Sequence, residues 1–158
     1  MQALPAIGLL AVGLHSAAPI KRGPLEGAWQ RVAETYLGPD TSWTIRGPQP
    51  SVYLFTKNYY SMMWVRGTKP RGRLTSGAAV ERLWAFESFR ANSGTYEVRD
   101  SVVTVHPVVA RIPNLVDVPS LTYVYRTRGD SLWLTISYTV VPDWTRTARV
   151  SVLLKRLE

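Results

Sequence analysis

The chain alternates between short runs of β-forming residues and short runs of turn-forming residues, and this rhythm constrains its fold more than any other feature. The β-forming runs are rich in Val, Thr, Tyr and Trp, and Gly, Pro, Asn and Asp separate them. We predict strands at residues 27–37, 51–56, 59–65, 95–99, 101–109, 121–127, 132–138 and 147–157. Because many connections are tight turns, consecutive strands are expected to pair antiparallel.

One segment departs from this rhythm and predicts a helix over residues 78–91. Its apolar residues fall at helical spacing: Ala78, Ala79, Leu83, Ala85, Phe86 and Phe89. Ser76 is a plausible N-cap, and Gly94 lies beyond the C-terminal end. The helix is therefore expected to interrupt the sheet after the third predicted strand.

The strand count and order predict a mainly β fold with one domain. About eight antiparallel strands in up-and-down order close into a single barrel, wide enough for one small ligand. Closure also removes the unpaired strand edges that promote aggregation. A β-sandwich is the alternative, but the many short hairpin turns favour the barrel.

The first 18 residues differ from the rest of the chain. They carry no Asp, Glu, Lys or Arg, and an apolar stretch from Leu4 to Leu14 leads into the small residues Ser16, Ala17 and Ala18. This pattern predicts a secretory signal peptide and export to the periplasm or the extracellular space. A loosely packed leader is the alternative, because no basic residue precedes the apolar stretch. Residues 19–24 are then a linker, and residues 25–158 are the folded domain.

Composition narrows the function classes. The chain has no Cys, which excludes disulfides, thiol nucleophiles and thiolate metal sites. Its two His are too few for a metal site made of histidines alone. The net charge is +8, but the basic residues are spread singly along the predicted strands, so we predict no nucleic-acid partner. One basic cluster exists, formed by Arg66, Lys69, Arg71 and Arg73. It is interpreted as a solvated loop, with weak contact to an anionic membrane or ligand headgroup as the alternative.

Several motifs resemble the lipocalins and the wider calycin superfamily. The first predicted strand opens with Gly27-Ala28-Trp29, and the last ends with Leu153-Leu154-Lys155-Arg156-Leu157. In that superfamily the early Trp lies at the closed end of the barrel, beneath a basic residue of the last strand. The resemblance implies this barrel-closing role for Trp29 and Arg156, with Lys155 as the alternative to Arg156.

Other stretches are similar to bacterial lipocalin-like domain proteins. They are residues 89–98, residues 102–107 and the Tyr60-Ser61-Met62 segment. The predicted helix interrupts the early strands, and the sequence stops at the last strand. These features set the chain apart from classical lipocalin transporters, which place a helix after their last strands.

Candidate ligand-binding residues are those that share a face on a predicted strand. They are Tyr60, Met62 and Trp64 on one strand, Tyr123 and Tyr125 on another, and His106. Ordinary barrel packing needs the same aromatic residues, so the two interpretations stay open. If the face of His106 lines the interior, this residue could contact a ligand or serve as general acid or base; a structural role is the alternative. Both faces of the predicted strand that contains Trp133 carry apolar residues, so its outer face is covered either by the helix or by a second copy of the chain. Monomer and dimer therefore both stay open.

The sequence favours binding over catalysis. It contains no nucleophile elbow, no phosphate-binding glycine loop and no zinc-protease motif. We assign no catalytic residue, metal or cofactor. The main prediction is an exported lipocalin-like barrel that binds a small hydrophobic or amphipathic molecule inside. The alternatives are a calycin-type isomerase or cyclase that uses His106 on an apolar substrate, and an envelope interaction domain with a filled barrel.

Overall fold

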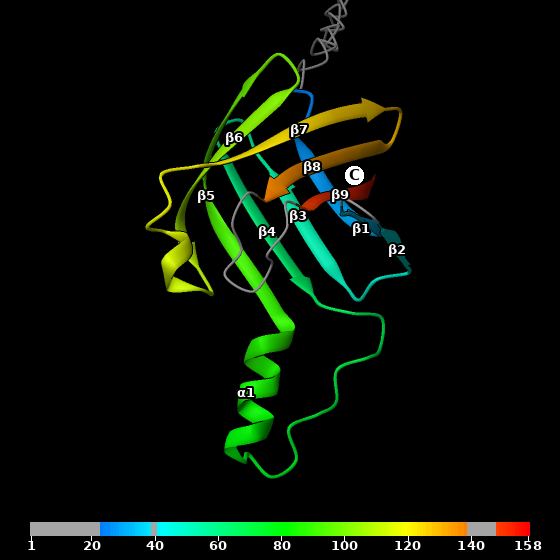
Figure 1. Ribbon diagram of the computed structural model, residues 1–158. Coiled ribbons are helices and arrows are strands. Elements are labelled where there is room, and N and C mark those ends of the chain that lie inside the picture. The colour runs from blue at the N-terminus through cyan, green and yellow to red at the C-terminus, as the bar shows by residue number, and fades with distance from the viewer. Residues whose placement is uncertain (1–22, 39–40, 139–147) are drawn as a thin grey trace, which may run out of the picture.

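The structure is a computed structural model that describes residues 23–38, 41–138 and 148–158. The predicted signal peptide at residues 1–18, most of the linker and the connection between the last two predicted strands lie outside these ranges. The described residues form one sheet with a single α-helix (Figure 1).

Nine strands follow the chain in order. They are β1 (Gly27–Leu37), β2 (Ser42–Arg46), β3 (Ser51–Phe55), β4 (Tyr59–Val65), β5 (Phe89–Arg99), β6 (Val102–Ala110), β7 (Leu121–Arg128), β8 (Ser131–Tyr138) and β9 (Ala148–Arg156). The α-helix α1 (Ala79–Ser88) joins β4 to β5, and a short 3₁₀ helix, η1 (Pro113–Leu115), lies between β6 and β7.

The sheet closes on itself. From β3 to β9 every strand pairs antiparallel with the next along the chain, and β1 pairs with both β3 and β9. The closing ladder is long, from Trp29 opposite Arg156 to Leu37 opposite Arg149. This arrangement confirms the predicted eight-stranded, antiparallel, up-and-down barrel, with one strand added.

The added strand is β2, in a region where sequence analysis predicted only a connection. β2 pairs with the second half of β1, and β3 pairs with the first half, so the two strands share one edge of β1. Stacking of Trp43 on Tyr36, with ring centroids 4.8 Å apart, fixes β2 in register. The pair Gly47-Pro48 follows β2 and interrupts what would otherwise be one longer strand.

The helix follows β4, which is the third strand of the barrel itself, and it ends earlier than predicted. Residues 89–91 continue the helical spacing of apolar residues, yet the chain turns into β5 at Phe89. The reason is pairing with β4, where Ala91 lies opposite Met63 and Asn92 opposite Met62. The strand predicted at residues 95–99 is therefore the second half of a longer strand.

Strict alternation builds the core. Along β3, residues Ser51, Tyr53 and Phe55 are buried while Val52 and Leu54 point outward. The innermost side chains come from β1, β4, β6, β8 and β9 and include Trp29, Met62, Val105, Leu134 and Leu154. No side chain of α1 is buried, and Figure 1 shows this helix projecting away from the barrel.

Candidate functional site

One end of the barrel is closed by contacts between the first and last strands. The Arg156 guanidinium lies 4.0 Å from the centroid of the Trp29 ring, and its Nη1 donates a hydrogen bond of 2.7 Å to the Glu26 carbonyl. Trp29 is fully buried, and its Nε1 donates to the Leu25 carbonyl at 2.8 Å. Lys155, the other basic candidate, donates to Ser131 Oγ instead.

Five of the six predicted ligand-binding residues lie on the inner wall. Tyr60 and Met62 of β4 are buried, and Trp64 follows them on the same face. Tyr123 and Tyr125 of β7 are partly buried and pack against the same core. The structure therefore gathers an aromatic surface from two sides of the barrel. Whether it contacts a ligand stays a prediction.

His106 lies apart from these five residues, on the outer face of β6. Val103 and Val105 are fully buried, so alternation turns His106 outward. Its Nδ1 donates to the Pro119 carbonyl at 3.0 Å, and its Nε2 lies 3.8 Å from Glu97 Oε1. A ligand-binding or catalytic role of His106 inside the barrel requires an inward-facing side chain, and the side chain of His106 faces outward.

A buried ion pair on β1 is the main interior feature that sequence reasoning missed. The side chain of Arg31 is 2% exposed, and its Nη2 donates to Glu34. These residues are three apart and would ordinarily face opposite sides of a strand. A register shift between Arg31 and Ala33 brings them to the same side. The detectable signal was a charged residue two positions after Trp29, at an inward position of the strand.

Several polar atoms of the interior, two of them in Arg31, are buried without a partner. Arg31 Nε and Nη1, Tyr60 Oη and Asn92 Oδ1 form no hydrogen bond within the described part of the chain. The Arg31 guanidinium lies 5.6 Å from the centroid of the Trp64 ring, so it faces the predicted aromatic surface. Burial of an unsatisfied polar group costs about 1–3 kcal/mol, so these atoms are candidates for contact with a ligand.

Burial also fixes the protonation of the interior phenols. Desolvation raises the pKa of Tyr60 to about 12, so its hydroxyl remains a hydrogen-bond donor at neutral pH. The pKa of Tyr36 is also raised above its ordinary value, mainly by burial and to a smaller extent by the nearby Glu34 carboxylate. The interior thus holds an ion pair, in which Arg31 and Glu34 neutralise each other, and uncharged tyrosine hydroxyls beside the aromatic surface.

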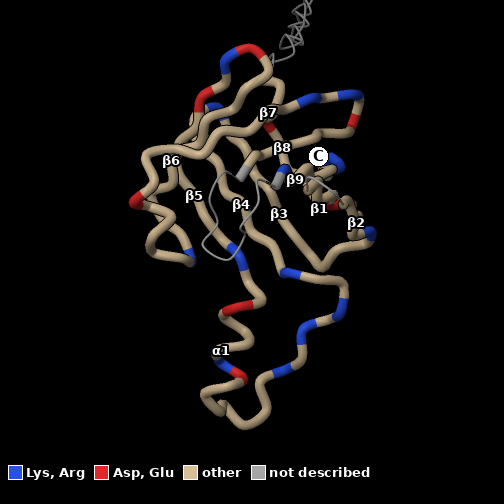
Figure 2. Tube along the Cα trace, in the orientation of Figure 1, with Lys and Arg blue, Asp and Glu red and all other residues tan. Residues whose placement is uncertain are grey.

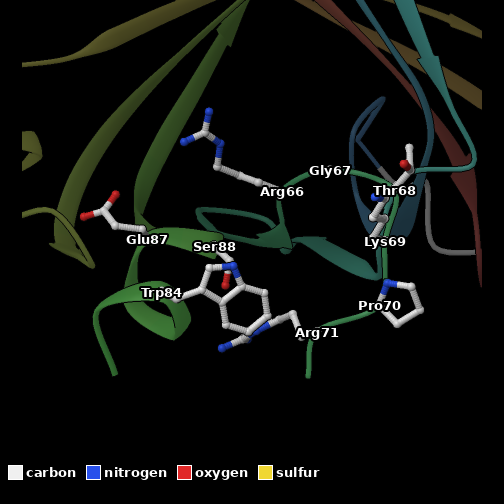
Figure 3. A pocket seen from close by; sticks show the side chains of 9 residues that line it. All are labelled: Arg66, Gly67, Thr68, Lys69, Pro70, Arg71, Trp84, Glu87 and Ser88. Carbon is white, nitrogen blue, oxygen red and sulfur yellow. The ribbon is translucent and has the colours of Figure 1, made fainter. Parts of the chain in front are cut away.

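An open pocket of about 690 Å³ lies outside the barrel, between α1 and the segment that follows β4. Its lining residues are Arg66, Gly67, Thr68, Lys69, Pro70, Arg71, Trp84, Glu87 and Ser88. In Figure 3 the basic side chains come from the segment after β4, and the Trp84 ring extends from the helix toward Arg71. Three of the four residues of the predicted basic cluster therefore line a pocket together.

Residues 23–38, 41–138 and 148–158 contain no group of three His, Cys, Asp or Glu residues that could hold a metal ion. They also contain no helix with the length and apolar character needed to cross a membrane.

Two of the solved structures that are similar to this chain come from Bacteroides species. One is a lipocalin-like protein from Bacteroides uniformis, with 16% identity over 85% of this chain and 100% of that chain, at a TM-score of 0.43. The other is an uncharacterized protein from Bacteroides eggerthii, with 12% identity over 83% of this chain and 98% of that chain, at a TM-score of 0.42. No protein-family model matches the chain, and no curated protein sequence matches it significantly. The fold assignment therefore rests on strand order and closure.

Proposed function

We propose that this barrel binds a small apolar molecule with a hydrogen-bond-accepting group in its interior. The observation that carries the proposal is the buried guanidinium of Arg31, which has two N–H groups without a partner beside the aromatic wall. A ligand oxygen that accepts from these groups would remove their desolvation penalty, and apolar burial would supply the rest of the affinity.

The ion pair limits the chemistry of that accepting group. Glu34 already compensates the charge of Arg31, so the free N–H groups suit a neutral acceptor such as a carbonyl, ester or hydroxyl oxygen. Tyr60, on the same face of β4 and four residues before Trp64, offers a separate donor, since its hydroxyl stays protonated. The ligand is amphipathic in this limited sense, with an apolar body and accepting oxygens that reach one or both of these donors. Export of the protein stays a prediction, because residues 1–18, the predicted signal peptide, lie outside the described residues.

Titration of the intrinsic Trp fluorescence tests the proposal. Trp64 borders the proposed site, so its emission is expected to change with long-chain alcohols, methyl esters or retinoids. Tyr60→Phe removes one donor and should weaken binding about 5- to 10-fold, the value of one hydrogen bond. Tyr59→Phe is the matched control, because Tyr59 is the neighbouring residue and is 62% exposed. Absence of a response to every lipophile tested, with no co-purified molecule in native mass spectrometry, would overturn the proposal.

A further inference from the structure

Within the described part of the chain, no residue covers the apolar face of the helix α1. Val80, Leu83 and Trp84 lie at i, i+3 and i+4 spacing and are 71%, 60% and 46% exposed. Leu74, in the preceding segment, is 53% exposed. A helix of ten residues is marginal in water when it buries nothing, so this face is suited to an additional surface. We refer to residues 66–88, which comprise α1 and the segment before it, as the arm.

The arm is also strongly cationic. Its basic residues are Arg66, Lys69, Arg71, Arg73 and Arg82, and its acidic residues are Glu81 and Glu87, a net charge of +3 from five cations and two anions. Figure 2 shows the basic residues distributed along the segment between β4 and α1. None of the five cations forms an ion pair with another described residue.

The two acidic residues are occupied within the protein. Glu81 accepts hydrogen bonds from the backbone N–H groups of Thr75, Ser76 and Gly77. Glu87 lies 4.0 Å from Arg90 and 3.9 Å from Arg111. The arm therefore presents uncompensated positive charge beside exposed apolar side chains.

We propose that the arm docks on an anionic membrane surface, with Val80, Leu83 and Trp84 in the interface and the basic residues at the phosphate level. Charge complementarity favours this partner over a second copy of the chain, because a copy carries the same +8 net charge and the same cationic arm. A nucleic acid would satisfy the cations but offers no apolar phase for Val80 and Leu83. A lipid surface provides both, and the open pocket beside Trp84 has room for a headgroup. The proposal does not depend on ligand binding inside the barrel.

Co-sedimentation with vesicles tests the docking. Phosphatidylcholine vesicles containing phosphatidylserine are expected to bind the protein at about 0.1 M salt, and pure phosphatidylcholine vesicles are not. The variant K69S/R71S/R73S should lose about 100-fold in partitioning, because each basic residue near a charged surface contributes about fivefold. The control K57S/R99S/R128S removes the same charge from exposed positions outside the arm and should lose much less.

A second variant separates apolar insertion from charge alone. V80S/L83S keeps every charge and should weaken binding about tenfold, since burial of these side chains contributes part of the affinity. Both residues are exposed, so circular dichroism should show an intact barrel in this variant. The proposal is overturned if the two charge variants bind equally, if V80S/L83S binds like the parent, or if duplex DNA competes with the vesicles but apolar substitution has no effect.

Discussion

Two residues far apart in sequence close the barrel at one end. Gly27 makes this contact possible, because its φ of +131° suits glycine and a Cβ there would lie 2.4 Å from Arg156 Nη1. The guanidinium of Arg156 thus reaches both the Trp29 ring and the Glu26 carbonyl.

Substitution of Arg156 should be much more costly than substitution of Lys155. Arg156→Ala removes a cation–π contact and a hydrogen bond, and we expect a loss of about 2–3 kcal/mol in the free energy of unfolding. Lys155→Ala removes an exposed side chain and its hydrogen bond to Ser131 Oγ, and should cost less than about 1 kcal/mol. Urea denaturation measures both, and equal losses would contradict a closing role for Arg156.

Tyr60 makes the stability of the protein sensitive to alkaline pH. Its pKa of about 12 in the folded state exceeds the ordinary value of 10.0, so only the unfolded chain loses this proton between these pH values. The free energy of unfolding should therefore fall as pH rises through this window, by about 2–3 kcal/mol from this residue. Tyr60→Phe should remove that part of the pH dependence, and Tyr59→Phe should leave it unchanged. Identical profiles for the two variants would exclude Tyr60 as the source.

At the scale of elements, periodicity alone could predict most strands but not where competing patterns meet. The spacing that continues a helix through Phe89 also supplies a strand, and pairing of Ala91 and Asn92 with β4 decides the outcome. The short strand β2 was missed because its pairing depends on stacking of Trp43 against Tyr36, a contact between separate strands.

The interior site was only partly predictable for a related reason. Alternation identified which residues share a face, but not which face of β6 is the inner one, and His106 lies outside. The pairing of Arg31 with Glu34 requires a register shift that no local sequence pattern predicts. Sequence reasoning could therefore predict the aromatic residues of the inner surface, but not the Arg31–Glu34 ion pair that lies beside them.

The pairing of β5 with β6 shifts register between Ser93 and Gly94, and this bulge provides a test of element packing. A Cβ added to Gly94 would lie 1.9 Å from the His106 carbonyl oxygen, which belongs to the backbone and cannot rotate away. Gly94→Ala is expected to destabilise the fold by roughly 3 kcal/mol, as overpacking does in a well-ordered core. Gly72→Ala is the control, because nothing lies within 4 Å of its added Cβ. Thermal unfolding that ranks the two variants equally would contradict close packing at this bulge.

At the scale of the whole molecule, the two ends of the barrel differ in character. β1 and β4 run in the same direction, since each is antiparallel to β3 between them. The arm, which follows β4, therefore leaves the barrel at the end opposite the Trp29 contact. One end is closed by interactions within the protein, and the other carries an arm whose apolar face is uncovered.

This asymmetry predicts that the molecule does not open as one unit. The strands β1 and β9 pair with each other over most of their length, and each also pairs with another strand, so their amides should exchange only on global unfolding, at roughly 5–15 kcal/mol. The helix α1 buries no side chain, and its amides should exchange by local opening at roughly 0–2 kcal/mol. Amides of β2, which pairs with β1 alone, should fall between these limits. Hydrogen exchange followed by NMR measures the opening free energies of these three sets of amides in one sample. If the amides of α1 were as protected as those of β9, the arm and the barrel would unfold as one cooperative unit, and the prediction would be wrong.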